Sequence, residues 1–101
     1  MAAALSNPQK RYLRGLAHHL KPVILVGAKG ITDNVAAETG NALDHHELIK
    51  VRVAAGDREL RDAWIGELVE RTGSDLVARI GNIAVLYKRS ADKPLIVLPK
   101  A

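Results

Sequence analysis

The sequence of 101 residues contains no cysteine and no phenylalanine. The lack of cysteine excludes disulfides and thiolate metal sites, and it is typical of proteins in a reducing compartment. Trp64, Tyr12 and Tyr87 are the only aromatic residues, so aliphatic side chains must fill the core and platforms for base stacking are scarce. There is no apolar run long enough to span a membrane and no signal-peptide pattern at the N-terminus. These absences favour a cytoplasmic protein.

Acidic residues are absent from the first 32 positions, which carry five lysines and arginines. Residues 33–78 hold ten acidic and five basic residues, whereas residues 79–101 hold five basic residues and one acidic residue. The positive charge therefore lies toward the two ends of the chain. A basic surface attracts phosphate backbones because binding releases counterions. The pattern favours nucleic acid as the partner, with ordinary solvated charge as the alternative.

The first third of the chain predicts a helix followed by a strand. Asn7 as the cap and a proline in the first turn predict a helix over 8–18. Pro22 ends that segment, because a proline disfavours helical geometry in the residue before it. The apolar run over 23–26 predicts a short strand buried on both faces.

Two further helices and a second strand follow. Thr32 suits the cap of a helix that ends near His46 and Glu47. Residues 48–53 alternate between apolar and basic side chains, which predicts a strand with one face inward. Asp57 suits the cap of a third helix.

The last third predicts a hairpin and an extended tail. The third helix is expected to stop at Gly73, and residues 75–80 and 83–88 form two strands joined by a two-residue turn. The tail over 94–98 is either a short edge strand or an extended cover. The sequence thus predicts one α/β domain over 1–101, with its core at about 8–98, in the order α-β-α-β-α-β-β. We expect a two-layer sandwich with a four-stranded mixed sheet.

The turn Gly27-Ala28-Lys29-Gly30 lies between the first strand and the second helix. A glycine at each end lets backbone amides approach a bound group closely, and Lys29 supplies positive charge. Unpaired amides at the start of a helix, together with the helix dipole, favour a phosphate. The alternative is that the glycines only make a tight strand-to-helix connection.

Two segments carry a family resemblance. Residues 16–32 (LAHHLKPVILVGAKGIT) and residues 42–51 (ALDHHELIKV) resemble the CRM domain, named for chloroplast RNA splicing and ribosome maturation. The resemblance is closest to the free-standing bacterial form, the YhbY-type proteins, and it extends from about residue 8 to residue 98. Two motifs in the right order are far more specific than a lone GxxG.

This resemblance implies an RNA-binding module that acts on precursors of the large ribosomal subunit. Ribosomal proteins are a separate class of expected partner, which suits the docking alternative considered below. The resemblance also implies a fold similar to the C-terminal domain of translation initiation factor 3 and a GxxG loop similar to that of KH domains. The expected RNA-binding residues are the loop and nearby basic side chains: Gly27, Ala28, Lys29, Gly30, Lys10, Arg11, Arg14 and Lys21. A secondary surface on the sheet, which the first helix could instead cover, comprises Lys50, Arg52, Arg79 and Lys88.

No constellation in the sequence predicts catalysis, a metal site or a cofactor. The histidines occur as adjacent pairs, 18–19 and 45–46, and adjacent helical residues do not share a face as zinc ligands must. Nucleotide-binding loops of the GxxxxGK[ST] or GxGxxG type are absent. A protein-docking module that uses its helices stays open as the alternative function. For the RNA-binding hypothesis, we expect Lys29→Glu combined with Gly30→Asp to weaken binding and leave the fold intact.

Overall fold

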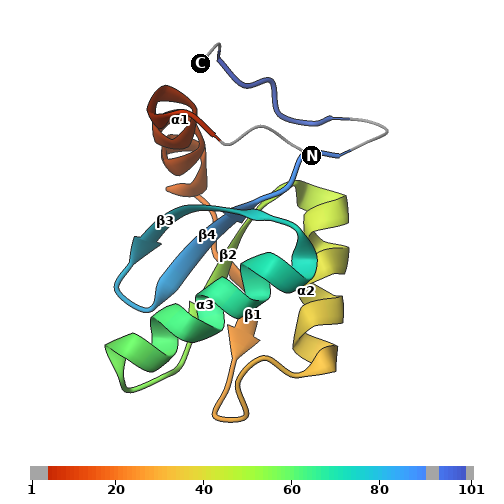
Figure 1. The fold of residues 1–101 in the computed structure, drawn as a ribbon. Coiled ribbons are helices and arrows are strands. Elements are labelled where there is room, and N and C mark those ends of the chain that lie inside the picture. Colours follow the sequence, from red (N-terminus) through yellow and green to blue (C-terminus); the bar gives the residue numbers. More distant parts are fainter. Residues whose placement is uncertain (1–4, 91–93, 100–101) are drawn as a thin grey trace.

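Helices and strands follow the predicted order in the computed structural model, which describes residues 5–90 and 94–99. Three helices and four strands occur in this part of the chain (Figure 1). They are α1 (Asn7–Ala17), β1 (Pro22–Val26), α2 (Asp33–His46), β2 (Leu48–Val53), α3 (Arg58–Thr72), β3 (Asp75–Ile80) and β4 (Ile83–Tyr87). The α/β class and the order of elements are confirmed.

The four strands form a mixed sheet in the order β1-β2-β4-β3. β1 and β2 are parallel and are connected through α2, whereas β4 runs antiparallel to both β2 and β3. β1 and β2 therefore end at the same end of the sheet, and β4 ends at the opposite end. β1 and β3 are the edge strands.

Helices cover both faces of the sheet. Alternate residues of β4 enter two separate core clusters: Ala84 and Leu86 join side chains of α2 and α3, and Val85 and Tyr87 join side chains of α1. Successive side chains of a strand point to opposite faces, so α1 packs on the face opposite α2 and α3. The predicted two-layer sandwich corresponds to the sheet with α2 and α3, and α1 adds a helix on the other face.

The helix caps agree with the sequence except at the start of α1. Ser6, not Asn7, is the N-cap, because its hydroxyl accepts a hydrogen bond from the Gln9 amide at 3.2 Å. The Gln9 side chain in turn accepts from the Ser6 amide at 3.0 Å, which completes a capping box and makes Asn7 the first helical residue. Thr32 and Asp57 cap α2 and α3 as predicted.

β1 is not buried on both faces, contrary to the prediction. Ile24 and Val26 are buried, but Val23 and Leu25 keep 54% and 62% of their surface exposed. The reason lies in the placement of α1, which packs mainly against β3, β2 and β4. The α1 side of the edge strand β1 is therefore left open.

Glu47 fastens the C-terminal segment to the domain. Its side chain is fully buried, and its backbone has a positive φ of 59° at the end of α2. The carboxylate accepts hydrogen bonds from the amides of Ser90 at 2.6 Å, Leu95 at 2.7 Å and Ile96 at 2.8 Å. Residues 94–99 form no strand, and Ile96 and Leu98 pack on the α1 core cluster. Of the two predictions for the tail, the extended cover is therefore confirmed.

We predict that Glu47→Gln releases this C-terminal segment. The amide side chain has one acceptor oxygen in place of two and sets an NH₂ group against backbone donors, so we expect a loss of about 2–3 kcal/mol in unfolding free energy. Urea denaturation measures the loss, and hydrogen exchange at Leu95 and Ile96 measures the release. Glu38→Gln, at an exposed position of α2, is the matched control, and an equal effect of both variants would contradict this role of Glu47.

We also predict an alkaline loss of stability that depends on Tyr87. Burial raises the pKa of the Tyr87 phenol above its ordinary value of 10, and the nearby Glu47 carboxylate raises it further. The folded state thus holds this proton more tightly than the unfolded state, so the contribution is complete below pH 10 and is lost as pH rises through the raised pKa. Tyr87→Phe should flatten the fall of the unfolding free energy above pH 10, whereas Tyr12→Phe, at an exposed tyrosine, should not.

Candidate nucleic-acid interface

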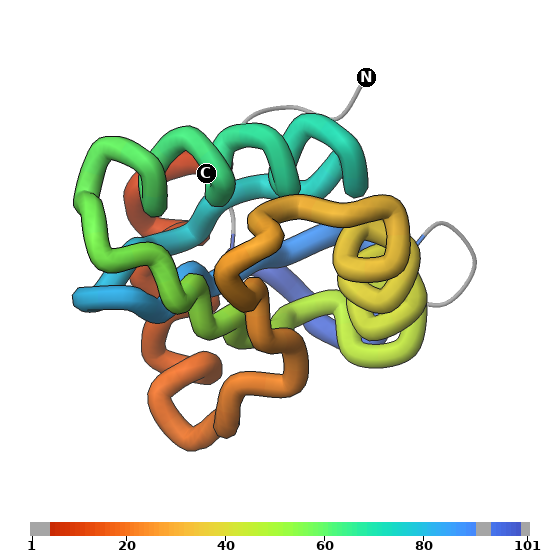
Figure 2. The backbone as a smooth tube through the Cα atoms, turned by 90° about the horizontal axis from the view of Figure 1, so that it is seen from below, coloured from red at the N-terminus to blue at the C-terminus, as the bar shows by residue number. Residues whose placement is uncertain are grey.

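The loop Gly27–Gly30 is a tight turn at the end of β1. The Gly30 amide donates to the Gly27 carbonyl at 3.1 Å, and the Thr32 amide donates to the Gly30 carbonyl at 3.1 Å. The side chains of Ala28 and Lys29 are exposed at its tip. Figure 2, which views the molecule from the end of the sheet where the loop lies, shows the chain passing beside α3 on its way to α2.

The two loop glycines have different reasons to be glycine. Gly30 is buried and has a φ of 75°, and a Cβ atom there would lie 2.9 Å from Cε2 of Trp64. The fold therefore requires glycine at position 30. Gly27 has no positive φ, and a Cβ atom there would meet nothing within 4 Å. The chain leaves open space in front of Gly27, where a bound group could approach the backbone.

Backbone donors around the loop are free to bind an anion. The amides of Ala28, Lys29, Asp33 and Asn34 have no hydrogen-bond partner within residues 5–90 and 94–99. The last two lie in the first turn of α2, where the helix dipole adds positive potential. Lys29 has no ion-pair partner in the same part of the chain. The turn thus combines a free cation with free amide donors.

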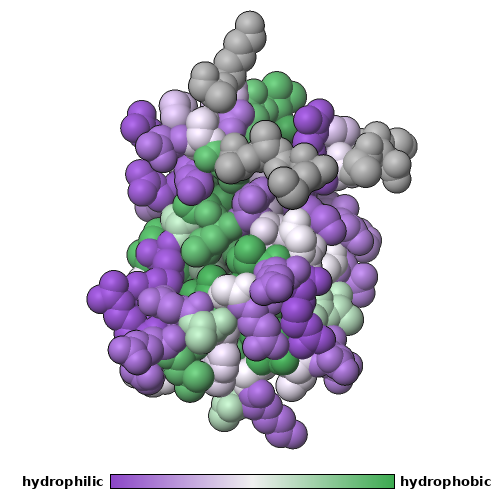
Figure 3. Space-filling model, in the orientation of Figure 1, coloured by the Kyte–Doolittle hydropathy of each residue, from purple (hydrophilic) through white to green (hydrophobic). Residues whose placement is uncertain are grey.

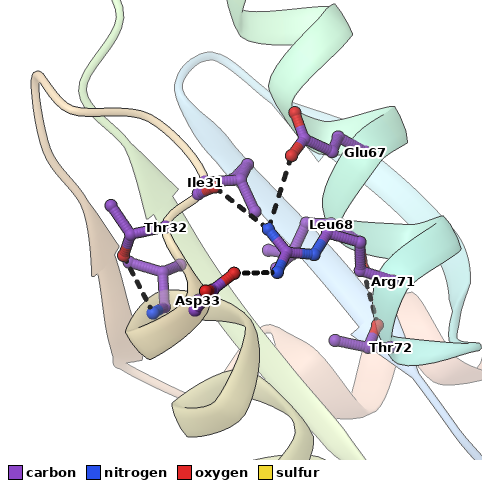
Figure 4. A network of polar contacts seen from close by, with 8 residues as sticks. Ile31, Thr32, Asp33, Glu67, Leu68, Arg71 and Thr72 are labelled. Carbon is purple, nitrogen blue, oxygen red and sulfur yellow. Dashed lines mark hydrogen bonds and ion pairs between the residues drawn. The ribbon is translucent and has the colours of Figure 1, made fainter.

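Arg71 of α3 holds the start of α2 and the end of the loop in place (Figure 4). Its guanidinium donates to the Asp33 carboxylate at 2.6 Å and to the Ile31 carbonyl at 3.2 Å, with Glu67 at 3.6 Å. The hydrogen bond to Asp33 raises the pKa of Arg71. Arg71 neutralises the negative charge of Asp33. The Asp33 carboxylate therefore does not cancel the positive charge of Lys29.

Sequence reasoning missed both supports of the loop. In the sequence Trp64 stood out only as one of the three aromatic residues, and no sequence signal singled out Arg71. The spacing of 34 positions between Gly30 and Trp64 carries no local pattern, so only the packing of α3 reveals that they touch.

The basic residues of α1 gather in a groove away from the loop. Arg11 and Arg14 line a groove of about 570 Å³ together with His18 and Lys50. Lys10 joins the two arginines in a smaller groove beside β3. Both grooves lie on the α1 face of the sheet, opposite α2 and α3, and we call the larger one the α1 groove. The predicted RNA-binding residues therefore form more than one site.

The side chains of Lys21 and of Arg52, a residue of β2, lie beside β1. Both line a groove of about 470 Å³ with Pro22, Val23, Ile24 and Leu25. Arg52 pairs in register with Leu25, and Leu25 stands two residues before the loop. Lys21, by contrast, precedes the start of β1. Lys21 and Lys29 are therefore at opposite ends of β1.

The predicted secondary surface is not one surface. Lys50 and Arg52 lie on the α1 face, but Arg79 reaches α3 on the other face, where its side chain pairs with Asp62 at 2.9 Å. Lys88 is directed to that face as well, with its Nζ near Gly73. Strand alternation and the bulge in β3 separate the four residues.

The groove beside Arg79 is mainly apolar, and Asp62 neutralises the charge of its arginine. Ile65, Val69 and Leu76 line it with the Arg79–Asp62 pair. Figure 3 shows apolar side chains gathered in the middle of this face of the molecule, with hydrophilic ones around them. Because its arginine is paired, this groove is less suited to phosphate than the loop or the α1 groove.

The described residues show neither a metal-binding cluster nor a membrane-spanning helix. Within 5–90 and 94–99, no group of three or more histidine, aspartate or glutamate side chains could hold a metal ion. No helix in the same ranges has the length and apolarity to cross a membrane.

Comparison with known proteins identifies the family. The model of the CRS1/YhbY (CRM) domain matches residues 5–88. The chain belongs to this family. A relative from Haemophilus influenzae named "RNA-binding protein" is 50% identical over 96 residues, which cover 95% of this chain and 96% of the relative. A Bacillus subtilis relative named "Probable RNA-binding protein YqeI" is 43% identical, covering 94% of this chain and 99% of its own length.

A solved structure has the same fold. The solution structure of a Staphylococcus aureus protein superposes with a TM-score of 0.82 at 38% identity, and it covers 94% of this chain and 99% of the other. The predicted family and fold class are thus both confirmed.

We predict that the two loop glycines respond differently to alanine. Gly30→Ala places a Cβ atom in the left-handed region and against the Trp64 ring, so the unfolding free energy should fall by roughly 2 kcal/mol or more. Gly27→Ala should change it by less than about 0.5 kcal/mol. Urea unfolding followed by Trp64 fluorescence measures both. Equal stability of the two variants would contradict the structural role of Gly30.

Proposed function

We propose that this protein binds RNA and holds its phosphate backbone at the loop Gly27–Gly30. The observation that carries the proposal is the loop itself: an unpaired lysine beside free backbone amides at a helix start, with open space in front of Gly27. Charge-assisted bonds from such donors suit phosphate oxygens. Contacts of this kind position RNA without reading its sequence.

The α1 groove supplies a second contact in this proposal. Arg11, Arg14 and Lys50 have no ion-pair partner within the described residues, and they line a groove of about 570 Å³. Because α1 lies on the other face of the sheet from α2 and α3, one short single strand does not fit both sites as readily as a folded RNA. A structured RNA with two phosphate backbones at the right spacing is the ligand that this arrangement favours.

The proposed RNA is ribosomal, in cytoplasmic precursors of the large subunit. The CRM family membership supports this choice, because the resemblance in the sequence implies such a partner. The names of the Haemophilus and Bacillus relatives support RNA binding in general. We propose a binding and assembly factor, not an enzyme.

The position of Trp64 against Gly30 changes which substitutions can test RNA binding by the loop. Gly30→Asp, expected from the sequence to leave the fold intact, would collide with Trp64, so its effect on binding could not be separated from misfolding. Gly27→Asp meets no atom of the chain within 4 Å at its Cβ position. Gly27→Asp and Lys29→Glu are therefore the informative pair.

We predict that Lys29→Glu combined with Gly27→Asp weakens binding to precursor large-subunit ribosomal RNA by about tenfold or more. Lys29→Ala alone should lower the slope of log K against log salt by roughly 0.7–0.9, which corresponds to one phosphate contact. Filter binding or fluorescence anisotropy across a salt series measures both quantities.

The matched control is Arg89→Glu, which changes the net charge as much as Lys29→Glu does. Arg89 follows β4 and lies at the opposite end of the sheet from the loop. Unchanged unfolding curves must accompany each variant. If Arg89→Glu weakens binding as much as Lys29→Glu, the effect belongs to net charge and the loop proposal is wrong.

A further inference from the structure

The edge strand β1 carries an open groove that the RNA contacts of the loop do not explain. Its lining includes four consecutive strand residues, Pro22 to Leu25, with Lys21 and Arg52. Consecutive residues of a strand point to alternate faces, so the groove takes in the backbone of β1 as well as the α1 face, where Val23, Leu25 and the neighbouring Arg52 of β2 lie. β1 pairs only with β2 among the described strands.

Two aliphatic side chains of this strand lie exposed side by side. Val23 and Leu25 are 54% and 62% exposed, and they are two positions apart, which places them on the same face. An edge strand with a strand-like apolar pair is a template for a further extended segment. Such a segment would gain main-chain hydrogen bonds at the edge and burial of both side chains.

The chemistry of the groove favours a protein segment over RNA. Unlike the tip of the loop, the groove presents the exposed aliphatic side chains of Val23 and Leu25, which phosphates would not bury, and it offers nucleobases no aromatic side chain for stacking. Aliphatic side chains at alternate positions instead match the alternating side chains of an extended peptide.

The charged residues of the groove indicate which kind of peptide would bind there. Lys21 and Arg52 are its charged residues, and it contains no acidic side chain. Neither cation has an ion-pair partner within residues 5–90 and 94–99. Pairing with a second copy of this chain would bring two basic edges together, which like-charge repulsion opposes.

We propose that the β1 edge, defined by residues 21–25 and Arg52, binds an extended, acidic and apolar segment of a partner protein. The segment adds a strand beside β1, places alternate aliphatic side chains on Val23 and Leu25, and sets carboxylates near Lys21 and Arg52. This site is separate from the phosphate contact of the loop, so the protein can hold RNA and a protein segment together.

The test uses the full chain and a synthetic peptide in which valine and glutamate alternate. Nuclear magnetic resonance titration should shift the amides of residues 23–26, and a peptide with lysine in place of glutamate should bind far more weakly. Leu25→Thr should weaken the glutamate peptide by about tenfold, the effect of losing the burial of one large apolar side chain. Leu60→Thr, at an exposed leucine of α3, should leave it unchanged.

Four results would overturn the proposal. One is the absence of shifts on β1, and a second is equal binding of the lysine peptide. A third is a stronger shift of the same amides by single-stranded oligouridylate, which would make the groove an RNA site. The fourth is a shift of these amides with protein concentration alone, which would make it a self-association edge. Leu25→Glu provides a second variant should threonine prove too conservative, and its folding is checked by its unfolding curve.

Discussion

The indole ring of Trp64 occupies the space where any side chain at position 30 would have to lie. This contact fixes the loop between β1 and α2 against α3, and the positive φ of Gly30 turns the chain toward the helix. Arg71, two turns further along α3, fastens the other end of the same connection through Ile31 and Asp33. The tip, Ala28 and Lys29, is then held out from a rigid frame. A preorganised loop of this kind loses little entropy when it binds.

The buried carboxylate of Glu47 plays a comparable part at the other end of the sheet. At this end of the sheet α2 ends, β2 begins and β4 ends. The Glu47 carboxylate binds the backbone amides of the C-terminal segment there, and the Glu47 backbone bonds to α2 and to the residue after β4. The segment covers apolar residues of the α1 cluster, including Tyr87. The binding surfaces proposed above are the loop, the α1 groove and the β1 edge, and all three are left uncovered by this arrangement.

Local chemistry determined most of what could be predicted. Thr32 and Asp57 cap helices because their side chains reach backbone amides three residues on, and the parallel crossover of β1 and β2 follows from an intervening helix. Where two capping candidates adjoin, as at Ser6 and Asn7, the reciprocal bond of Gln9 decides between them. The sequence favoured the residue beside the proline and was wrong by one position.

The features that could not be predicted depend on tertiary packing. An apolar run such as 23–26 looks the same whether one or both of its faces are covered, and the position of α1 decides which. The glycines at 27 and 30 are equivalent in a GxxG motif, yet only one is required by a ring from α3. The separation of Arg79 and Lys88 from Lys50 and Arg52 follows from strand alternation together with a bulge in β3, and that bulge has no signal in the sequence.

The most direct measurement of the central claim is a map of the amino acids that crosslink to RNA. The protein would be mixed with precursor particles of the large ribosomal subunit and irradiated, and its RNA-linked peptides would be identified by mass spectrometry. The account predicts crosslinks in residues 27–30, with a second group on α1. Crosslinks confined to the α2 and α3 face near the Arg79–Asp62 pair, with none at the loop, would contradict it.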